Sequence, residues 1–499
     1  MRNELVAYFE AHQKLCEASA LELILENPQP LALSREVVDL AGEDHPVVTR
    51  ELVEEAVLRE AHRSTARAEV RPTGARGSSV PGPHPGFGLI AEGFSPLPQG
   101  REPKAAFEGL FQSRFEAISR LLRAHPELSD VRPISELGDG EGAVQVIAMV
   151  REVRQTVEQH HLILTVEDPS GAVEVLVPHD SPAARHPFIP DEVVGLRVTA
   201  ARERGRLPRA TAVYRPDASA ARSTRTPGHP SRVLFLSDLH IGSRSFLSEE
   251  WSHLAEFLDG RGNVPEIARE IEHVVIAGDL VDGIGIYPDQ ERDLEITDIF
   301  EQYRELGRRL KELPARLNII AIPGNHDAVC PAEPQPSLSS ELREYLPANV
   351  RTVGNPSTFA LEGVVVEAYH GRSFDDLIPA IPGASYARPT EVMKRMLLMR
   401  HLAPIYGGRT PMTPVVRDGL VIDPTPQILV TGHAHTFGVD LYHGILLLNA
   451  STWQAETEYQ RMRNISPVPA HAAVVDLGSL QVTPFDFSRP ARLPPIPAA

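Results

Sequence analysis

Three stretches of the chain decide its fold: VLFLSDLH at 233–240, HVVIAGDLVDG at 273–283 and LNIIAIPGNHD at 317–327. Each opens with a short apolar run, which is typical of a strand buried on both faces. The segments between them have helical periodicity, so strands and helices are expected to alternate. This alternation indicates an α/β domain, which we expect to fill residues 232–499.

Polar residues that can bind divalent cations end each of these strands and recur further along the chain. They are Asp238, His240, Asp279, Asp282, Asn325, His326 and Asp327, followed by His370 in YHGRSF and by His433 and His435 in TGHAH. The carboxyl ends of neighbouring strands meet at one crevice, so these side chains are expected to converge there. Carboxylate, amide and imidazole groups together suit Mn²⁺, Fe²⁺ or Zn²⁺.

The order of these motifs, D-x-H, G-D-x-x-D-G, G-N-H-D, H and G-H-x-H, resembles that of the calcineurin-like, or Mre11-type, metallophosphoesterases. The resemblance implies two divalent metal ions, with Mn²⁺ as the first expectation and Mg²⁺, Fe²⁺ or Zn²⁺ as alternatives. Asp279 is implied to bridge the two ions. The remaining implied ligands are Asp238, His240 and His435 for one ion and Asn325, His370 and His433 for the other.

The same resemblance implies catalytic roles next to the metals. His326 is expected to protonate the leaving oxygen, with Asp327 or a backbone group holding its tautomer. Arg372 is a candidate for binding substrate phosphate, or it pairs with a neighbouring aspartate. Asp282 is expected to hydrogen-bond within its loop or to a ligand histidine. Four other histidines, expected to be structural or solvated, are His160, His161, His401 and His443.

The chain before residue 232 divides into further segments. Residues 132–215 contain short strand-like runs such as HLILTVED and AVEVLVP, separated by turn residues such as DPSG at 168–171, which predicts a small antiparallel barrel, with an OB-fold as the candidate. Residues 105–131 are expected to form a docking helix. The other expected segments are a small helical module at 1–62 and flexible linkers rich in Pro, Gly and Ser at 63–104 and 216–231.

An OB-type barrel directly before such a domain resembles the small subunits of archaeal family D DNA polymerases. Segments such as REVRQT, MLLMRHLAPIYGG and NASTWQAETEYQRMRNISPVP are also similar to that family, and the resemblance covers about residues 105–490. It implies a dimetal 3′→5′ proofreading exonuclease in a two-subunit replicative polymerase. The implied partners are the large catalytic subunit and DNA 3′ ends, with a sliding clamp as a further candidate.

Two other functions fit the same residues. The chain could be a non-catalytic scaffold that keeps its metals for structure, or a repair nuclease of the Mre11 type that acts as a homodimer. The sequence contains no P-loop and no separate polymerase carboxylate cluster that we can identify. DNA synthesis is therefore expected only together with the large subunit.

Composition limits where and how the chain is expected to act. The 67 acidic and 49 basic residues give a formal charge of −18, which disfavours non-specific coating of nucleic acid or of anionic membranes. No apolar run approaches the roughly 18 to 20 residues that a membrane span needs, and only two cysteines are present. We expect a cytoplasmic protein. Residues 197–232 hold a local run of arginines that could contact DNA or the large subunit: Arg197, Arg202, Arg204, Arg206, Arg209, Arg215, Arg222, Arg225 and Arg232.

Overall fold

The computed structural model describes most of the chain from residue 86 onwards. The described residues are 86–98, 100, 102–137, 142–158, 160–199, 207–218, 231–261, 264–462 and 465–489, with isolated positions between 15 and 53. The chain forms two units, Met1–Gly77 and Ser78–Ala499. In the first unit, β1 (Leu15–Cys16) pairs in parallel with β2 (Val47–Val48). The helical module expected at 1–62 otherwise lies outside the described residues.

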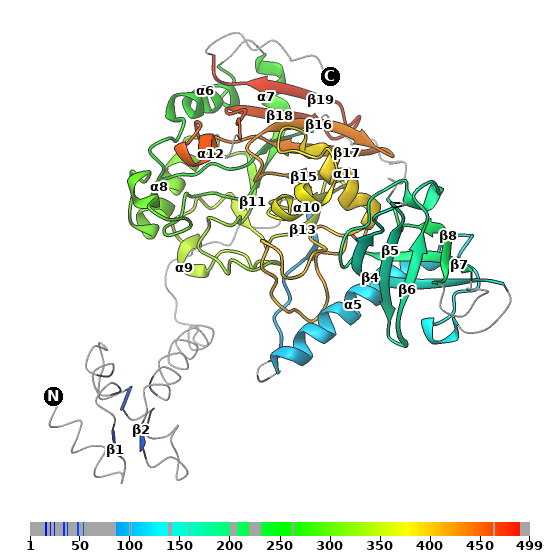
Figure 1. Cartoon of the computed structure of the whole chain (residues 1–499). Coiled ribbons are helices and arrows are strands. Elements are labelled where there is room, and N and C mark those ends of the chain that lie inside the picture. The colour runs from blue at the N-terminus through cyan, green and yellow to red at the C-terminus, as the bar shows by residue number, and fades with distance from the viewer. Residues whose placement is uncertain are drawn as a thin grey trace. The chain divides into compact units, whose positions relative to one another are not determined.

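Two six-stranded sheets form the centre of the second unit (Figure 1). The first has the order β12-β11-β10-β9-β18-β19, and its first four strands are parallel. Its strands are β9 (Arg232–Leu236), β10 (Ile271–Ala277), β11 (Asn318–Ile322), β12 (Val350–Thr352), β18 (His471–Asp476) and β19 (Val482–Asp486). The second has the order β16-β17-β15-β14-β13-β3. Its strands are β3 (Phe87–Glu92), β13 (Ser357–Leu361), β14 (Val364–Ala368), β15 (Ile428–Thr431), β16 (Phe437–Tyr442) and β17 (Ile445–Ala450).

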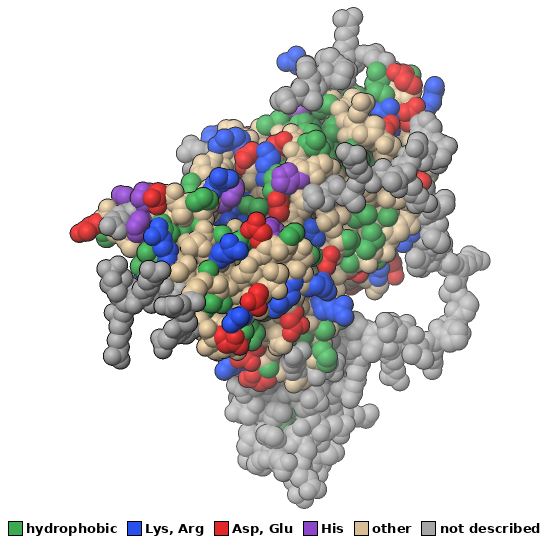
Figure 2. Space-filling view, turned by 90° about the vertical axis from the view of Figure 1, so that its right-hand side faces the viewer, with side chains coloured by type: hydrophobic (Ala, Val, Ile, Leu, Met, Phe, Trp, Pro, Cys, Tyr) green, Lys and Arg blue, Asp and Glu red, His purple; other side chains and the backbone are tan. Residues whose placement is uncertain are grey.

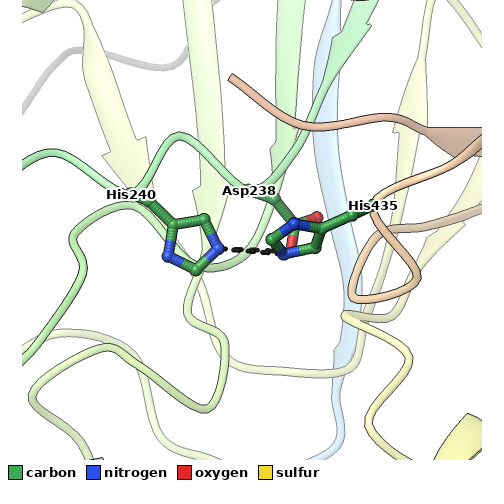
Figure 3. A group of neighbouring side chains, drawn as sticks. All are labelled: Asp238, His240 and His435. Atoms are coloured by element: carbon green, nitrogen blue, oxygen red, sulfur yellow. Dashed lines mark hydrogen bonds and ion pairs between the residues drawn. The ribbon is translucent and has the colours of Figure 1, made fainter. Parts of the chain in front are cut away.

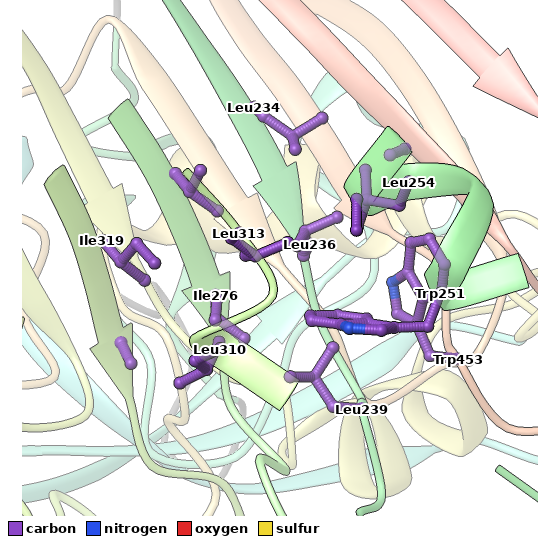
Figure 4. Close-up of a cluster of buried hydrophobic side chains, with 14 of the residues drawn as sticks. Leu234, Leu236, Leu239, Trp251, Leu254, Ile276, Leu310, Leu313, Ile319 and Trp453 are labelled. Atoms are coloured by element: carbon purple, nitrogen blue, oxygen red, sulfur yellow. The ribbon is translucent and has the colours of Figure 1, made fainter. Parts of the chain in front are cut away.

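Alternating side chains along the strands build three apolar layers. In β9, Val233 and Phe235 pack against the second sheet. Leu234 and Leu236 point the opposite way, into a cluster with Trp251 and with the helices outside the first sheet (Figure 4). A third cluster covers the outer face of the second sheet. The result is a helix–sheet–sheet–helix sandwich, which is the α/β domain that the sequence predicts.

Helices cover the outer faces of both sheets. Over the first sheet lie α6 (Ser248–Leu258), α7 (Pro265–Glu270) and α8 (Ile299–Leu310). Over the second lie α10 (Phe374–Ala380) and α11 (Pro389–Met399). Shorter helices are α9 (Ser340–Arg343), α12 (Glu458–Met462), η1 (Ile134–Glu136), η2 (Pro182–Ala184) and η3 (Gln290–Arg292).

A closed five-stranded barrel with the order β4-β5-β6-β8-β7 lies between β3 and β9 in the sequence. Its strands are β4 (Ala143–Gln155), β5 (Leu162–Asp168), β6 (Gly171–Val177), β7 (Val193–Thr199) and β8 (Arg209–Tyr214). The long strand β4 pairs with both β5 and β7, and β6 meets β8 to close the ring. At the β5–β6 turn, Asp168 Oδ1 accepts from the backbone N–H of Ser170 at 2.7 Å. The turn expected at DPSG is therefore held by its own aspartate.

Helix α5 (Pro103–Arg123) contacts both the barrel and the sandwich. Its Ile118 and Leu122 pack against barrel residues such as Ile147. On another face, the fully buried Arg114 donates from Nε to Asp418 Oδ2 at 2.7 Å. Helix α5 therefore joins the barrel to the loops of the sandwich.

Strand β3 corrects one expected boundary. Residues 87–92 fall inside the linker expected at 63–104, but they pair antiparallel with β13 as the outermost strand of the second sheet. Phe87 packs on Phe359 with ring centroids 5.8 Å apart. The strand segment FGLIAE is only six residues long and lies among many Pro and Gly residues, whose abundance favours a linker. The sandwich therefore begins before the barrel in the sequence.

Within the part of the chain that the structure describes, no helix has both the length and the apolar character needed to cross a membrane.

Candidate metal centre

One pocket of about 470 Å³ collects most of the residues that the sequence singled out. Its wall includes the loops at the carboxyl ends of β9, β10, β11, β14 and β15 and residues after β17 such as Gln454 and Gln460. Of the expected site residues, those that line it are His240, Asp279, Asn325, His326, Arg372, His433 and His435. Asp238 and His370 are fully buried and contact lining residues from behind. The structure thus brings together residues that lie far apart in the sequence, Asp238 and His435 among them.

The backbone is strained at five of the expected ligand positions. Their φ angles lie between 49° and 61°, a region that side-chain-bearing residues seldom occupy. The five residues are Asp238, His240, Asp279, His433 and His435. Such strain persists only where the surrounding structure holds it, and it concentrates at functional sites. Here it follows from turning each side chain off the end of a strand toward the pocket.

The first set of donors consists of Asp238, His240 and His435 (Figure 3). The Nε2 atoms of the two histidines face each other at 3.1 Å. Asp238 Oδ1 lies 3.2 Å from the Nε2 of His435 and 3.8 Å from that of His240. Among the described residues, this buried Oδ1 has no hydrogen-bond partner. A cation between these three atoms would satisfy all of them, so the set fits a divalent metal ion.

The second set of donors contains Asp279, whose carboxylate also lies near His240 of the first set. Asp279 Oδ2 is 3.3 Å from His370 Nε2 and 3.7 Å from His240 Nε2, which places the carboxylate between the two sets. Asn325 Oδ1 lies 3.1 Å from the same His370 nitrogen. His433 completes a group with Asp279 and His370 whose ligand atoms lie within 4.8 Å of one another. Amide, carboxylate and imidazole donors fit a second divalent ion here.

Each of the four histidines has one ring nitrogen held by a neighbouring polar group. Nδ1 of His240 lies 2.8 Å from Asp282 Oδ1, and Nδ1 of His370 lies 2.9 Å from the carbonyl of Ala277. The other two contacts join His435 Nδ1 to the side chain of Gln460 at 2.7 Å and His433 Nε2 to Asp375 Oδ1 at 3.2 Å. Such contacts fix the tautomer and the ring orientation of metal-ligating histidines.

The electrostatics of the pocket favour positive charge at its centre. Burial alone would lower the pKa of His370, but the adjacent Asp279 carboxylate outweighs it and raises that pKa to about 9. Burial likewise opposes ionisation of Asp279, whereas His370 and His326 hold its pKa well below the usual range. Buried carboxylates that stay ionised need a nearby cation.

His326 and Asp327 are placed differently. His326 lines the pocket, and its Nδ1 lies 2.7 Å from the carbonyl oxygen of Asp282. Burial lowers its pKa. The carboxylate of Asp327 does not hold this ring: it accepts from the backbone N–H groups of Gly324 and Leu280 and from the hydroxyl of Tyr303. Of the two expected ways to hold His326, the backbone group is the one present, and Asp327 fixes the loop instead.

Several pocket residues escape sequence reasoning because they lie outside the metal motifs. Tyr386 donates its hydroxyl to Asp375 Oδ1 at 2.6 Å, and Arg409 lines the pocket beside Arg372. Gln454 and Gln460 come from the NASTWQAETEYQ segment. That segment resembles the polymerase family but contains no metal motif. Its two glutamines were the one feature of its sequence that could have indicated pocket residues.

The arginine-rich stretch at 197–232 divides into paired and exposed residues. Arg215 pairs with Glu192 at 3.1 Å, and Arg232 pairs with Glu270 at 2.7 Å. Arg197 and Arg209 are exposed. The face in Figure 2 shows basic and acidic side chains interspersed. The other arginines of the stretch, Arg202, Arg204, Arg206, Arg222 and Arg225, lie outside the described residues.

The four histidines expected to have no role in the site lie outside the pocket. His401 is buried with Nε2 3.0 Å from Asp418 Oδ2. His161 stacks on His179, and its neighbour His160 is exposed. His443 lies near Asp217 at 3.4 Å.

Comparisons with known proteins identify the family of the chain. Residues 233–439 match the family of B subunits of DNA polymerases alpha and epsilon. The chain is 41% identical over 370 residues to the DNA polymerase II small subunit of Archaeoglobus fulgidus, covering 73% of each protein. It is 38% identical over 383 residues to that of Methanothermobacter thermautotrophicus, covering 75% of this chain and 78% of the relative.

Among solved structures, the chain is similar to Vacuolar Protein Sorting 29 from Cryptosporidium parvum. The TM-score is 0.29 and the identity 16%, covering 53% of this chain and 95% of the other. The family assignment follows from the curated relatives, which match most of the chain at more than a third identity. This chain belongs to the family of archaeal DNA polymerase II small subunits.

Proposed function

We propose that this small subunit carries a 3′→5′ exonuclease that removes nucleotides from DNA 3′ ends and depends on two divalent ions, with Mn²⁺ as the first expectation. The observation that carries the proposal is a set of three histidines, His240, His370 and His435, each with Nδ1 held by a neighbouring polar group and Nε2 directed toward a buried carboxylate. In a purely structural cluster, the Nε2 atoms of His240 and His435 would not need to face each other at 3.1 Å beside the buried Asp238 carboxylate.

The ligands for the two ions are divided as follows: Asp238, His240 and His435 on one side, Asn325, His370 and His433 on the other, and Asp279 between them. Bound divalent ions supply Lewis acidity, which activates water and neutralises charge on phosphoryl oxygens. The chain's own residues orient the substrate and donate a proton to it.

His326 is suited to donate a proton to the departing 3′ oxygen when its ring is doubly protonated. Nδ1–H then donates to the Asp282 carbonyl, Nε2 gives its proton to the leaving oxygen, and the neutral ring keeps the proton on Nδ1. Arg372 and Arg409 line the same pocket and are suited to bind the phosphate of the incoming strand. The product would be a nucleoside 5′-monophosphate.

As a member of its family, the chain is the small subunit of an archaeal two-subunit DNA polymerase, and its partner is the large catalytic subunit. The barrel's strand order, with β4 paired to both β5 and β7, supports an OB-type fold. DNA is the proposed substrate. The sliding clamp stays a candidate partner, and residues 1–62, which could bind it, are largely outside the described residues.

The test is digestion of a primer–template with a mismatched 3′ end, in Mn²⁺, with and without the large subunit. Release of nucleoside 5′-monophosphates by the wild-type chain, lost in the Asp279→Asn and His433→Ala variants, is the expected result. If a clean wild-type preparation never degrades mismatched or single-stranded DNA, alone or with its partner, the chain is a non-catalytic scaffold.

A further inference from the structure

A loop at the rim of the pocket exposes apolar side chains to solvent. Ile284 is 46% exposed and Ile286 38% exposed. Ile286 and Tyr287 line the same pocket as His326. A single exposed isoleucine needs no explanation, but an apolar group at the rim of a charged pocket marks a surface that contacts a ligand. We call Ile284, Ile286 and Tyr287 the apolar rim.

The apolar rim is held in place by buried polar side chains. The backbone N–H of Ile286 donates to Gln290 Oε1 at 2.9 Å, and Gln290 Nε2 donates to the carbonyl of Asp282 at 2.8 Å. Gln290 is fully buried. The hydroxyl of Tyr287 donates to Asp293 at 3.0 Å, which fixes its ring. The exposure of the rim is therefore a fixed feature of the fold, and little ordering is needed when a ligand binds.

The rim is also joined to the expected general acid. Gly283 has a φ of 73°, and a Cβ there would lie 2.3 Å from the carbonyl oxygen of His326 and 3.1 Å from Ile286 Cγ1. The Asp282 carbonyl that receives the Gln290 amide also lies 2.7 Å from His326 Nδ1. A group resting on the rim would therefore lie beside the position where His326 meets the leaving oxygen.

Another part of the same wall is cationic. Arg372 and Arg409 both line the pocket. Nε of Arg372 is buried and has no hydrogen-bond partner among the residues that the structure describes. A ligand that matches both regions has a flat apolar face joined to an anionic group. A nucleotide of a DNA strand, with its base and its phosphate, has this composition.

We propose that the apolar rim binds the 3′-terminal nucleobase of the DNA strand, so that the site favours ends whose last base is unpaired. This inference rests on the proposed exonuclease function and specifies which DNA ends the exonuclease prefers. A base can lie against Ile286 and Tyr287 only after it leaves its partner strand, and leaving costs least when the base is mismatched. Base contacts of this kind tolerate any sequence because every base has an apolar face.

The experiment compares two single-stranded oligonucleotides that differ only at the 3′ residue, which is thymidine in one and an abasic tetrahydrofuran unit in the other. Full-length protein digests each in Mn²⁺, and binding to each is measured by fluorescence anisotropy in Ca²⁺, which reports affinity without turnover. The variants are Ile286→Ala and Tyr287→Leu. Leu441→Ala is the matched control, because Leu441 is a 64% exposed residue of β16 that does not line the pocket.

The wild type and Leu441→Ala should prefer the thymidine end over the abasic end by about tenfold, the order expected for one stacked base. Ile286→Ala and Tyr287→Leu should reduce this ratio toward one, with unchanged thermal melting. Equal treatment of the two ends by the wild type would overturn the inference, as would an unchanged ratio in both rim variants. If the wild type digests neither oligonucleotide, the exonuclease proposal fails, and the ratio of affinities in Ca²⁺ still decides whether the rim binds the base.

Discussion

Two clusters of buried charge in the sandwich are built from the same kinds of residue but differ in how their polar atoms are satisfied. In the α5 cluster, Arg114 pairs with Asp418, Arg114 Nη1 donates to the carbonyl of Pro404 at 2.6 Å, and His401 lies 3.0 Å from the same carboxylate. Asp418 Oδ1 accepts from the backbone of Leu420. This cluster carries its own cation, and its bonds are complete.

In the pocket cluster, the carboxylates of the two donor sets pair with histidines, and among the described residues neither of the pocket's arginines, Arg372 and Arg409, forms an ion pair with them. Its carboxylates face imidazole nitrogens, two of which point at each other across 3.1 Å. A histidine beside a built-in cation behaves differently: burial, followed by the charge of Arg114, lowers the pKa of His401 to about 4, whereas the pKa of His370 is raised to about 9. The difference teaches that a buried cluster is structural when its charges are already paired and is a binding site when the pairing is left to a ligand.

The largest effect is expected on catalysis, when a carboxylate of the pocket cluster is replaced. Asp279→Asn removes the charge shared by both donor sets and should lower mismatch digestion about a thousandfold or more. The rate is compared per folded molecule, because Asp279 also pairs with the buried His370 and its loss can lower stability. Initial rates in Mn²⁺ measure the digestion, and unfolding followed by tryptophan fluorescence measures the stability. Asp289→Asn, an exposed carboxylate change in the nearby loop, is the control. A fully active Asp279→Asn protein would refute the site assignment.

In the α5 cluster, the corresponding change should affect stability instead. Asp418→Ala leaves the fully buried Arg114 without its carboxylate, and loss of one partner of a buried pair costs about 3–5 kcal/mol. Urea unfolding, followed by the fluorescence of Trp251 and Trp453, measures the loss. The exonuclease rate per folded molecule should stay near that of the wild type. Little change in unfolding free energy would mean that Arg114 escapes to solvent when its partner is removed.

Glu367 sharpens the comparison because it is buried and forms no ion pair with any residue that the structure describes. Thr358 donates to it at 2.5 Å, and burial raises its pKa from 4.5 to about 7. Below pH 4.5 the carboxyl is protonated in both the folded and the unfolded chain, so Glu367 causes no loss of stability there. Between pH 4.5 and 7 the unfolded chain loses the proton first, which removes up to about 3 kcal/mol of stability by pH 8.

Glu367→Gln should remove this contribution to the pH dependence. The free energy of unfolding, measured in urea at pH 5 and pH 8, should therefore fall less in the variant than in the wild type. Because other groups titrate in the same window, the comparison is between the two proteins at each pH. An identical fall in both would show that Glu367 ionises normally.

The smallest effect expected is on metal affinity. Gln460→Ala removes the side chain that holds His435 Nδ1 at 2.7 Å, and such changes cost about 10- to 100-fold in affinity for the metal. A Mn²⁺ titration followed by electron paramagnetic resonance measures it. Gln481→Ala, in an exposed turn, is the matched control. A merely structural role would instead lower thermal stability at unchanged Mn²⁺ affinity.

The motifs were readable from the sequence because each metal-type residue follows directly from a buried strand. Asp238 and Asp279 stand at the ends of β9 and β10, so strand adjacency alone brings them together. The polymerase small-subunit family, which is expected from the barrel and from segments outside the metal motifs, is confirmed by the curated relatives. The assignment of individual ligands and of the metal stays a prediction.

What the sequence could not show depends on packing between distant segments. Asp375 and Gln460 reach the pocket from α10 and α12, whose positions are set by the third apolar cluster and by the segment after β17. Gln460 lies in a segment without a metal motif, and Asp375 follows the YHGRSF segment without being one of its expected ligands. The place of Asp327 was equally hidden, because its carboxylate points away from the ring of its neighbour, a choice made by the backbone N–H groups of Gly324 and Leu280.

The pairing of β3 with β13 has a consequence for any attempt to divide the chain. Because the sandwich takes its outermost strand from residues 87–92, a recombinant fragment that starts at residue 232 would leave β13 with an uncovered row of N–H and C=O groups. Such a bare edge is a template for intermolecular strand pairing, so the fragment should aggregate. A soluble truncation would have to begin upstream of Phe87 and retain the barrel.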